Sequence, residues 1–106
     1  MDRNKRKEIA ELARILADLN EPKLIKDFLI CMLTPKEIDE IAGRWSLVKM
    51  LDRGESQREI ARRLGMSLCK ITRGSKELKK RGSAFKQVLE RYVYTQPEKE
   101  TQTQNK

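Results

Sequence analysis

Apolar residues recur at intervals of three and four along most of this chain, and that interval predicts helices rather than strands. Between residues 4 and 19 the other positions are mostly filled by charged residues, which predicts an amphipathic helix. Its apolar face carries Ile9, Leu12, Ala13, Leu16 and Leu19. A new helix start follows, with Asn20 as its cap and Pro22 in the first turn, where proline is tolerated.

The second predicted helix is apolar on more than one side. Its main stripe comprises Leu24, Ile25, Phe28, Leu29, Met32 and Leu33, and Ile30 and Cys31 widen it. A surface this wide needs cover on several sides. We expect a second subunit to provide that cover, and a buried central helix within one chain is the alternative.

A third helix start is indicated at Thr34, where Pro35 and Glu37 complete a capping box with proline at the first helical position. We expect this helix to end at Gly54 and to face inward with Ile38, Ile41, Trp45, Val48 and Leu51. Gly43 costs about 1 kcal/mol relative to alanine inside a helix, so we expect another backbone to pack closely there.

Residues 56–80 predict two short helices joined by a tight turn. Ser56 and Glu59 form a capping box in which each side chain satisfies a backbone N–H. Gly65 can end the first helix in the left-handed conformation, and Ser67 can cap a second helix. We expect that helix to carry Leu68, Ile71 and Leu78 on one side. The spacing of Ala61, Gly65 and Ile71 is typical of a helix-turn-helix, and an ordinary helical hairpin with a solvated basic face is the alternative.

Charge favours the helix-turn-helix. Residues 57–82 hold nine lysines and arginines against two acids, a net of +7 in a chain whose net charge is +8. A merely solvated surface would mix the signs, whereas one-sided positive charge binds a polyanion through phosphate contacts that weaken with salt. We therefore expect this segment to bind double-stranded DNA.

The last predicted helix begins at a Ser83 cap and has Phe85, Val88, Leu89 and Tyr92 as its apolar face. Residues 95–106 are polar and predict a disordered tail. The 106 residues thus predict a single all-α domain over residues 1–94. A domain this small buries only a modest part of its surface alone, which again favours a dimer.

The composition argues against several functions. The chain has no histidine, and its cysteines, Cys31 and Cys69, show no metal-binding spacing, so we expect neither an enzyme nor a metal site. The sequence has no apolar run of transmembrane length and no signal-peptide pattern. We expect a cytoplasmic protein with no membrane partner, and no disulfide.

Four short stretches of the sequence together resemble the bacterial Trp repressor family. They are CMLTPKE, the pair of Gly43 and Arg44, RGESQREI and, most specifically, ITRGSKELK, and they lie within residues 31–79. The resemblance implies an all-α, intertwined homodimer with six helices per subunit. It also implies repression of genes for tryptophan biosynthesis or transport, through a palindromic DNA operator that is bound when L-tryptophan is present as corepressor.

The resemblance further implies a corepressor site. Arg44 and Arg73 fall where the family sandwiches the indole ring, and Gly74 falls where the ligand approaches the second helix of the helix-turn-helix. Residues of the partner subunit that offer backbone groups to the ligand correspond to Cys31, Leu33 and Thr34.

From the residues alone, Gly74 replaces the bulky apolar residue that usually packs such a head on its body, which predicts a gap. The adjacent arginine suits a flat ligand with a carboxylate, because guanidinium stacks on aromatic rings and pairs with carboxylates. For Arg44, the alternative is an exposed arginine whose stem covers apolar surface.

DNA contacts are expected at the starts of the two helices. The residues expected to face base edges are Arg58, Leu68, Cys69, Lys70 and Thr72, and those expected at phosphates are Gln57, Ser75 and Lys76. Ser67, Lys79 and Lys80 complete the expected interface.

Three features depart from the family pattern. Glu77 replaces a serine near the ligand's amino group, Lys70 replaces a threonine, and the RGESQRE loop is one residue shorter. Glu77 is expected to pair with the ammonium of tryptophan, or alternatively to point to solvent and pair with Lys80 or Arg81. Two other functions stay open: a regulator of the same fold that responds to another ligand or to none, and a small basic RNA-associated helical module.

Overall fold

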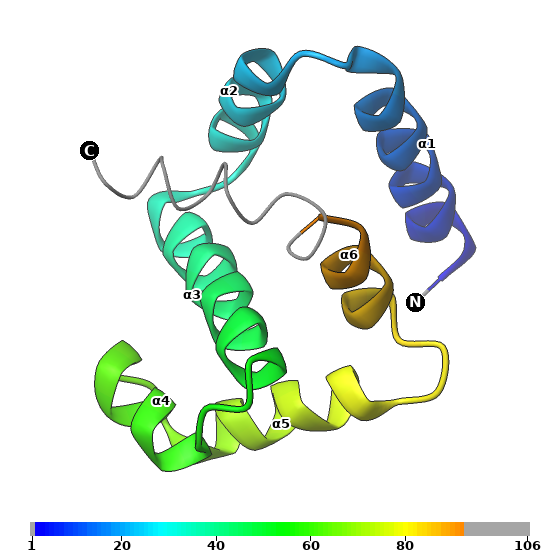
Figure 1. Cartoon of the computed structure of the whole chain (residues 1–106). Helices are drawn as coiled ribbons and strands as arrows, with labels where there is room; N and C mark the ends of the chain where they lie inside the picture. The colour runs from blue at the N-terminus through cyan, green and yellow to red at the C-terminus, as the bar shows by residue number, and fades with distance from the viewer. Residues whose placement is uncertain (1, 93–106) are drawn as a thin grey trace. The chain divides into compact units, whose positions relative to one another are not determined.

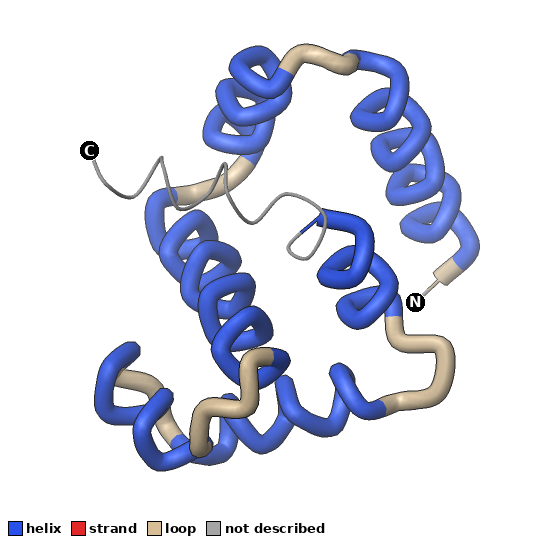
Figure 2. The backbone as a smooth tube through the Cα atoms, viewed as in Figure 1, coloured by secondary structure: helices blue, strands red, loops and turns tan. Residues whose placement is uncertain are grey.

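The computed structural model describes residues 2–92, and the tail expected at residues 95–106 lies outside them. The described residues form six α-helices and no strand, which confirms the predicted all-α class (Figure 1). The helices are α1 (Arg3–Leu19), α2 (Pro22–Met32), α3 (Pro35–Asp52), α4 (Gln57–Leu64), α5 (Leu68–Lys79) and α6 (Ala84–Tyr92). Short loops join consecutive helices (Figure 2). Over the described range, no helix has both the length and the apolar character that a membrane crossing requires.

The chain divides into two compact units, Met1–Asp39 and Glu40–Lys106. The first unit contains α1, α2 and the beginning of α3, and the second contains most of α3 together with α4, α5 and α6. All residues of the helix-turn-helix belong to the second unit. The expectation of a single domain over residues 1–94 stays a prediction.

Two helix starts differ from the sequence prediction. Asp2 caps α1, because its Oδ1 accepts a hydrogen bond of 2.8 Å from the backbone N–H of Lys5. Asn20 does not cap α2 as expected; it ends α1 in the left-handed conformation at φ 52°, which asparagine tolerates better than most residues. Glu21 occupies the N-cap of α2 and makes no side-chain capping bond, so Pro22 is the main start signal of that helix.

The two capping boxes have different outcomes. At α3 both expected bonds are present: the Thr34 backbone N–H donates to Glu37 Oε1 at 2.9 Å, and the Glu37 backbone N–H donates to Thr34 Oγ1 at 3.1 Å. At α4 the Glu59 backbone N–H donates to Ser56 Oγ at 3.1 Å, but the Glu59 carboxylate pairs with Arg62 instead of returning to Ser56. The hydrogen bond from Arg62 lowers the pKa of Glu59, so this carboxylate stays charged in the first turn of α4.

The core of the second unit lies between α3 and the helix-turn-helix. Its buried members are Leu47, Met50, Ile60 and Ile71. Leu51, Ala61, Leu64 and Met66 pack against this cluster. Gly65 closes α4 with φ 65°, and the turn that follows brings α5 back along the same core.

The inward face of α3 is only partly as predicted. Val48 is fully buried, but Ile41 is 50% exposed, while Leu47 and Met50, which were not assigned to the inward face, are buried. The reason is that the second half of α3 is covered on more than one side, whereas the prediction assumed a single stripe. A stripe rule therefore misplaces residues on a helix of this kind.

The apolar faces of α5 and α6 are also narrower than predicted. Ile71 and Leu89 are fully buried, whereas Leu68 is 52% exposed at the first position of α5. Val88 and Tyr92 of α6 are exposed at 41% and 60%. Ser83 caps α6 as expected, accepting a 3.3 Å hydrogen bond from the backbone N–H of Lys86.

Candidate ligand pocket and DNA-binding surface

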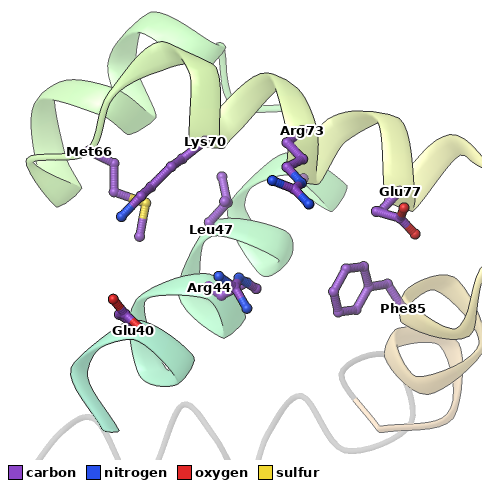
Figure 3. Close-up of a pocket in the computed structure, with 9 residues that line it drawn as sticks. Glu40, Arg44, Leu47, Met66, Lys70, Arg73, Glu77 and Phe85 are labelled. Atoms are coloured by element: carbon purple, nitrogen blue, oxygen red, sulfur yellow. The ribbon is translucent and has the colours of Figure 1, made fainter. Parts of the chain in front are cut away.

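A pocket of about 460 Å³ lies between α3, α5 and α6 of the second unit (Figure 3). Its lining combines charged residues with three large apolar side chains. The residues are Glu40, Arg44, Leu47, Met66, Lys70, Arg73, Gly74, Glu77 and Phe85. A cavity of this size falls within the usual range for small-molecule sites, about 300 to 1,000 Å³.

Four residues that the sequence analysis assigned to the ligand line this pocket: Arg44 from α3, and Arg73, Gly74 and Glu77 from α5. Arg73 points from α5 toward the side on which Arg44 lies (Figure 3). Four further lining residues were not predicted from the sequence: Glu40, Leu47, Met66 and Phe85. Glu40 carried a usable signal, because it lies one helical turn before Arg44 and so shares its face of α3.

The cations of the pocket are not neutralised by nearby acids. Within the described residues, Arg44, Lys70 and Arg73 form no ion pair, although Glu40 and Glu77 line the same cavity. Glu77 instead pairs with Lys80, the C-cap residue of α5, with Nζ and Oε2 3.2 Å apart. This ion pair is the one expected if Glu77 acts only at the surface, yet the same side chain also borders the pocket. Three unpaired cations around an apolar floor make the pocket suited to a ligand that is both anionic and aromatic.

Gly74 is a point of close approach between α5 and α3. A Cβ atom at this position would lie 3.0 Å from Leu47 Cδ2 and 3.7 Å from Leu51 Cδ1. The gap predicted here from the sequence is absent on the side toward α3, because Leu47 already occupies that space. Glycine therefore lets α5 lie close to α3, and it leaves its other side open to the pocket.

Gly43 provides a second close approach. A Cβ atom there would lie 2.8 Å from Met66 Cε, so the glycine accepts the methionine side chain from the turn of the helix-turn-helix. The close neighbour expected at Gly43 is present, but it is a side chain rather than a backbone. Met66 thereby links the turn between α4 and α5 to the body helix α3.

Polar contacts hold the two helices of the head together. The Thr72 hydroxyl donates to Gln57 Oε1 at 3.1 Å, which joins α5 to the start of α4. In the loop between α3 and α4, Glu55 pairs with both Arg53 and Arg63, with N–O distances of 3.2 and 2.7 Å. The loop is therefore fastened to α4 by a two-armed carboxylate bridge.

Most residues expected at DNA are accessible on the head. Arg58 is exposed on α4, and Leu68, Cys69, Lys70 and Thr72 are exposed along the start of α5, with Ser67 exposed at its N-cap. Lys76, Lys79 and Lys80 are also exposed, and Gln57 is half-buried. Ser75 departs from this set because it is only 6% exposed, next to Gly74 on the packed side of α5, and its expected phosphate contact stays a prediction.

The remaining expected ligand residues belong to the first unit. Cys31 lies in the last turn of α2, Leu33 is the C-cap of that helix, and Thr34 caps α3. Their expected role is to reach the ligand from a partner subunit, and it stays a prediction. Residues 2–92 contain no cluster of three or more potential metal ligands.

Comparison with known proteins gives concordant matches. The family model described as Trp repressor protein matches residues 7–93. A "Trp operon repressor homolog" of Chlamydia trachomatis serovar D is 32% identical over 80 residues, which is 74% of this chain and 85% of that protein. Proteins with the same name from Vibrio parahaemolyticus and Vibrio cholerae are 36% and 38% identical, covering 77% and 68% of this chain and 78% and 71% of their own lengths.

Proposed function

The chain belongs to the Trp repressor family of DNA-binding, non-enzymatic transcription regulators, and within that family we propose that it is a tryptophan-responsive repressor. It would bind a palindromic operator as a homodimer when L-tryptophan is bound, and so repress genes of tryptophan biosynthesis or transport. The observation that carries this proposal is the pocket between α3 and α5, with Arg44 and Arg73 unpaired and Gly74 beside them.

The chemistry of the pocket supports an amino acid with an aromatic side chain. The guanidinium groups of Arg44 and Arg73 can pair with a carboxylate and stack on an indole face. Leu47 and Met66 supply apolar contact for the ring. Such a ligand offers a carboxylate to the arginines and a ring to the apolar residues. A purely aliphatic or purely anionic ligand would not match both kinds of lining residue.

Glu77 would recognise the ammonium group of the ligand. Its carboxylate lines the pocket, and its present partner is Lys80, whose side chain is 66% exposed. An ion pair this exposed contributes under ~1 kcal/mol, so exchanging Lys80 for a ligand ammonium costs little. A charge-assisted bond to the less exposed ammonium would then stabilise the bound state.

The ligand would act on the head by favouring one position of α5. Arg73, Gly74 and Glu77 all lie on α5, while Arg44 and Leu47 belong to α3. A molecule bound to both helices stabilises the tilt at which both sets of contacts are made. The ligand shifts the population only as far as it binds that tilt better than others.

The exposed residues at the starts of α4 and α5 would face the operator. Arg58 and Lys70 would contact base edges, and Lys76 and Lys79 would contact phosphates. Ser75 is left out of this interface because of its burial. The hydrogen bond between Thr72 and Gln57 holds the two helix starts in a fixed relation, as joint insertion at a groove requires.

A homodimer is supported by the first unit. Neither α1 nor α2 has a buried residue, and large apolar side chains such as Ile9, Leu24, Ile30 and Met32 are 45% to 55% exposed. Apolar exposure on this scale marks an interaction surface. A second copy of the chain would cover it and would bring two heads to sites about one DNA turn, or ~34 Å, apart.

Calorimetric titration with L-tryptophan tests the proposal at the pocket. We expect one site per subunit in the unmodified protein and its loss in Arg73→Ala. An alternative is a family member whose ligand is another anionic molecule, which the additional positive charge of Lys70 in the lining favours. Absence of heat with L-tryptophan would support that alternative.

A further inference from the structure

We propose that Phe85 selects an aromatic ring in the ligand and that the ion pair between Asp52 and Lys86 positions it. This inference rests on the proposed function, because it concerns the same pocket. Among residues 2–92, Phe85 is the sole aromatic residue of the lining, and it comes from α6, outside the helix-turn-helix. Its ring extends from α6 toward the space between Arg44 and Glu77 (Figure 3).

The position of Phe85 forms one end of a pocket otherwise built by α3, α5 and the turn at Met66. A ring that lies flat against the two arginines would present its edge or face to Phe85. Aromatic pairs gain roughly 0.5 to 1.5 kcal/mol beyond area burial, which corresponds to a difference in affinity of about 2.3-fold to 12-fold. Phe85 is therefore placed to distinguish an aromatic from an aliphatic side chain.

The helix that carries Phe85 is fastened directly beside it. Lys86, the next residue, places its Nζ 2.9 Å from Oδ1 of Asp52, the last residue of α3. Leu89, one turn after Phe85, is fully buried. Because both fastening points lie within the helical turn that follows Phe85, they determine the direction in which its ring enters the pocket.

The Asp52 carboxylate depends on its ion pair with Lys86 because the Asp52 side chain is buried. Its side chain is 3% exposed, and its second oxygen, Oδ2, has no hydrogen-bond partner among the described residues. A buried carboxylate that loses its cation is strongly unfavourable, so α6 cannot shift without stranding this charge. The hydrogen bond to Asp52 also raises the pKa of Lys86, so the lysine stays charged well above neutral pH. The pair thus acts as a fixed joint between the end of α3 and α6.

The selectivity of Phe85 is tested by calorimetry on the full chain with L-tryptophan and with indole-3-propionate. Phe85→Leu keeps an apolar side chain of similar volume, and we expect it to lower the affinity for both compounds threefold to tenfold. Phe85→Tyr keeps the ring and should stay within twofold of the unmodified protein. Equal affinities for Phe85→Leu and the unmodified protein would overturn the assignment, and the melting temperature of each variant controls for folding.

The two compounds also separate this inference from the proposed function. If indole-3-propionate binds and L-tryptophan does not, the proposed corepressor is wrong, and the effect of Phe85→Leu on indole-3-propionate still tests ring selection. If neither compound binds the unmodified protein, both proposals are wrong.

The positioning role of the ion pair is tested by a double-mutant cycle. Lys86→Gln should weaken ligand binding threefold to tenfold, and Lys86→Arg, which keeps the charge, should restore it. In the Phe85→Leu background, Lys86→Gln should have no further effect, because no ring is left to position. An equal effect of Lys86→Gln in both backgrounds would overturn the positioning role, since a general loss of stability acts independently of the ring.

Discussion

Gly74 of α5 lies against Leu47 of α3, and a Cβ atom on the glycine would stand 3.0 Å from the leucine Cδ2. This contact sets the distance between the head helix and the body at the pocket. Alanine improves helix propensity by up to ~1 kcal/mol, but overpacking at a buried contact costs about 1 to 3 kcal/mol. We expect Gly74→Ala to lower the free energy of unfolding, measured by urea denaturation.

Gly43→Ala is the matched control for that prediction. The added Cβ would meet only the terminal Cε of Met66, at 2.8 Å, and a methionine end can move at little cost. The gain in helix propensity should then dominate, so this variant should be as stable as the unmodified protein or more stable by up to ~1 kcal/mol. A larger loss for Gly43→Ala than for Gly74→Ala would contradict the packing account.

Gly74→Val should abolish ligand binding. The valine methyl groups would press on Leu47 and also enter the pocket, so the variant should lose both stability and calorimetric heat with L-tryptophan. Retention of normal affinity in a folded Gly74→Val protein would show that the ligand does not use this face of α5.

Glu77 should make the ligand's amino group important for affinity. Indole-3-propionate lacks the ammonium, so its binding would leave two carboxylates in the pocket without a cation between them. We expect it to bind more weakly than L-tryptophan, and Glu77→Ser should narrow the difference, as measured by calorimetry. Lys80→Ala frees Glu77 from its present partner and should raise the affinity for L-tryptophan. Equal affinities of the two compounds for the unmodified protein would place Glu77 outside the ligand's reach.

The pattern of residues along the chain predicted the helices well, because helix caps and turns are determined by residues close together in the sequence. The Thr34 box and the left-handed Gly65 each depend on a few neighbouring residues, and both are present. Asn20 was misassigned because the same residue type suits the end of one helix and the start of the next.

The site was less predictable because it is built from packing between distant segments. Arg44 and Arg73 were reached through the family resemblance, and they do line one pocket. Phe85 and Leu47 carry no local signal for a pocket, since their contribution depends on how α6 and α3 meet α5. The burial of Ser75 likewise follows from the approach at Gly74, which a surface-charge argument does not include.

The DNA-facing residues should divide into two kinds. Arg58→Ala should cost roughly 1 to 3 kcal/mol on a specific site and relax its sequence preference, if Arg58 contacts a guanine. Lys76→Ala and Lys79→Ala should each weaken binding to all sequences alike. Each should also reduce the slope of log affinity against log salt concentration by about 0.9, the value for one phosphate contact. Fluorescence anisotropy on specific and random duplexes at several salt concentrations measures both effects. Equal losses on both duplexes for all three variants would contradict the division.

The dimer should depend on the apolar surface of the first unit. Ile30→Lys places a charge on a side chain that is 49% exposed in the single chain, and it should shift the protein toward monomer in sedimentation experiments. Lys26→Ala, on the same helix at an exposed polar position, is the control and should leave the dimer intact. A stable folded monomer of the unmodified protein at micromolar concentration would contradict the proposed assembly.

The most direct test of the account is the affinity for a palindromic duplex, selected for binding by this protein, measured with and without saturating L-tryptophan. Coupling between two sites of one protein is typically worth 1 to 3 kcal/mol, so we expect the amino acid to tighten DNA binding roughly 5- to 150-fold. Arg73→Ala should remove this effect while the unliganded affinity changes little. An affinity that is the same with and without L-tryptophan would contradict the claim that the pocket between α3 and α5 controls the head.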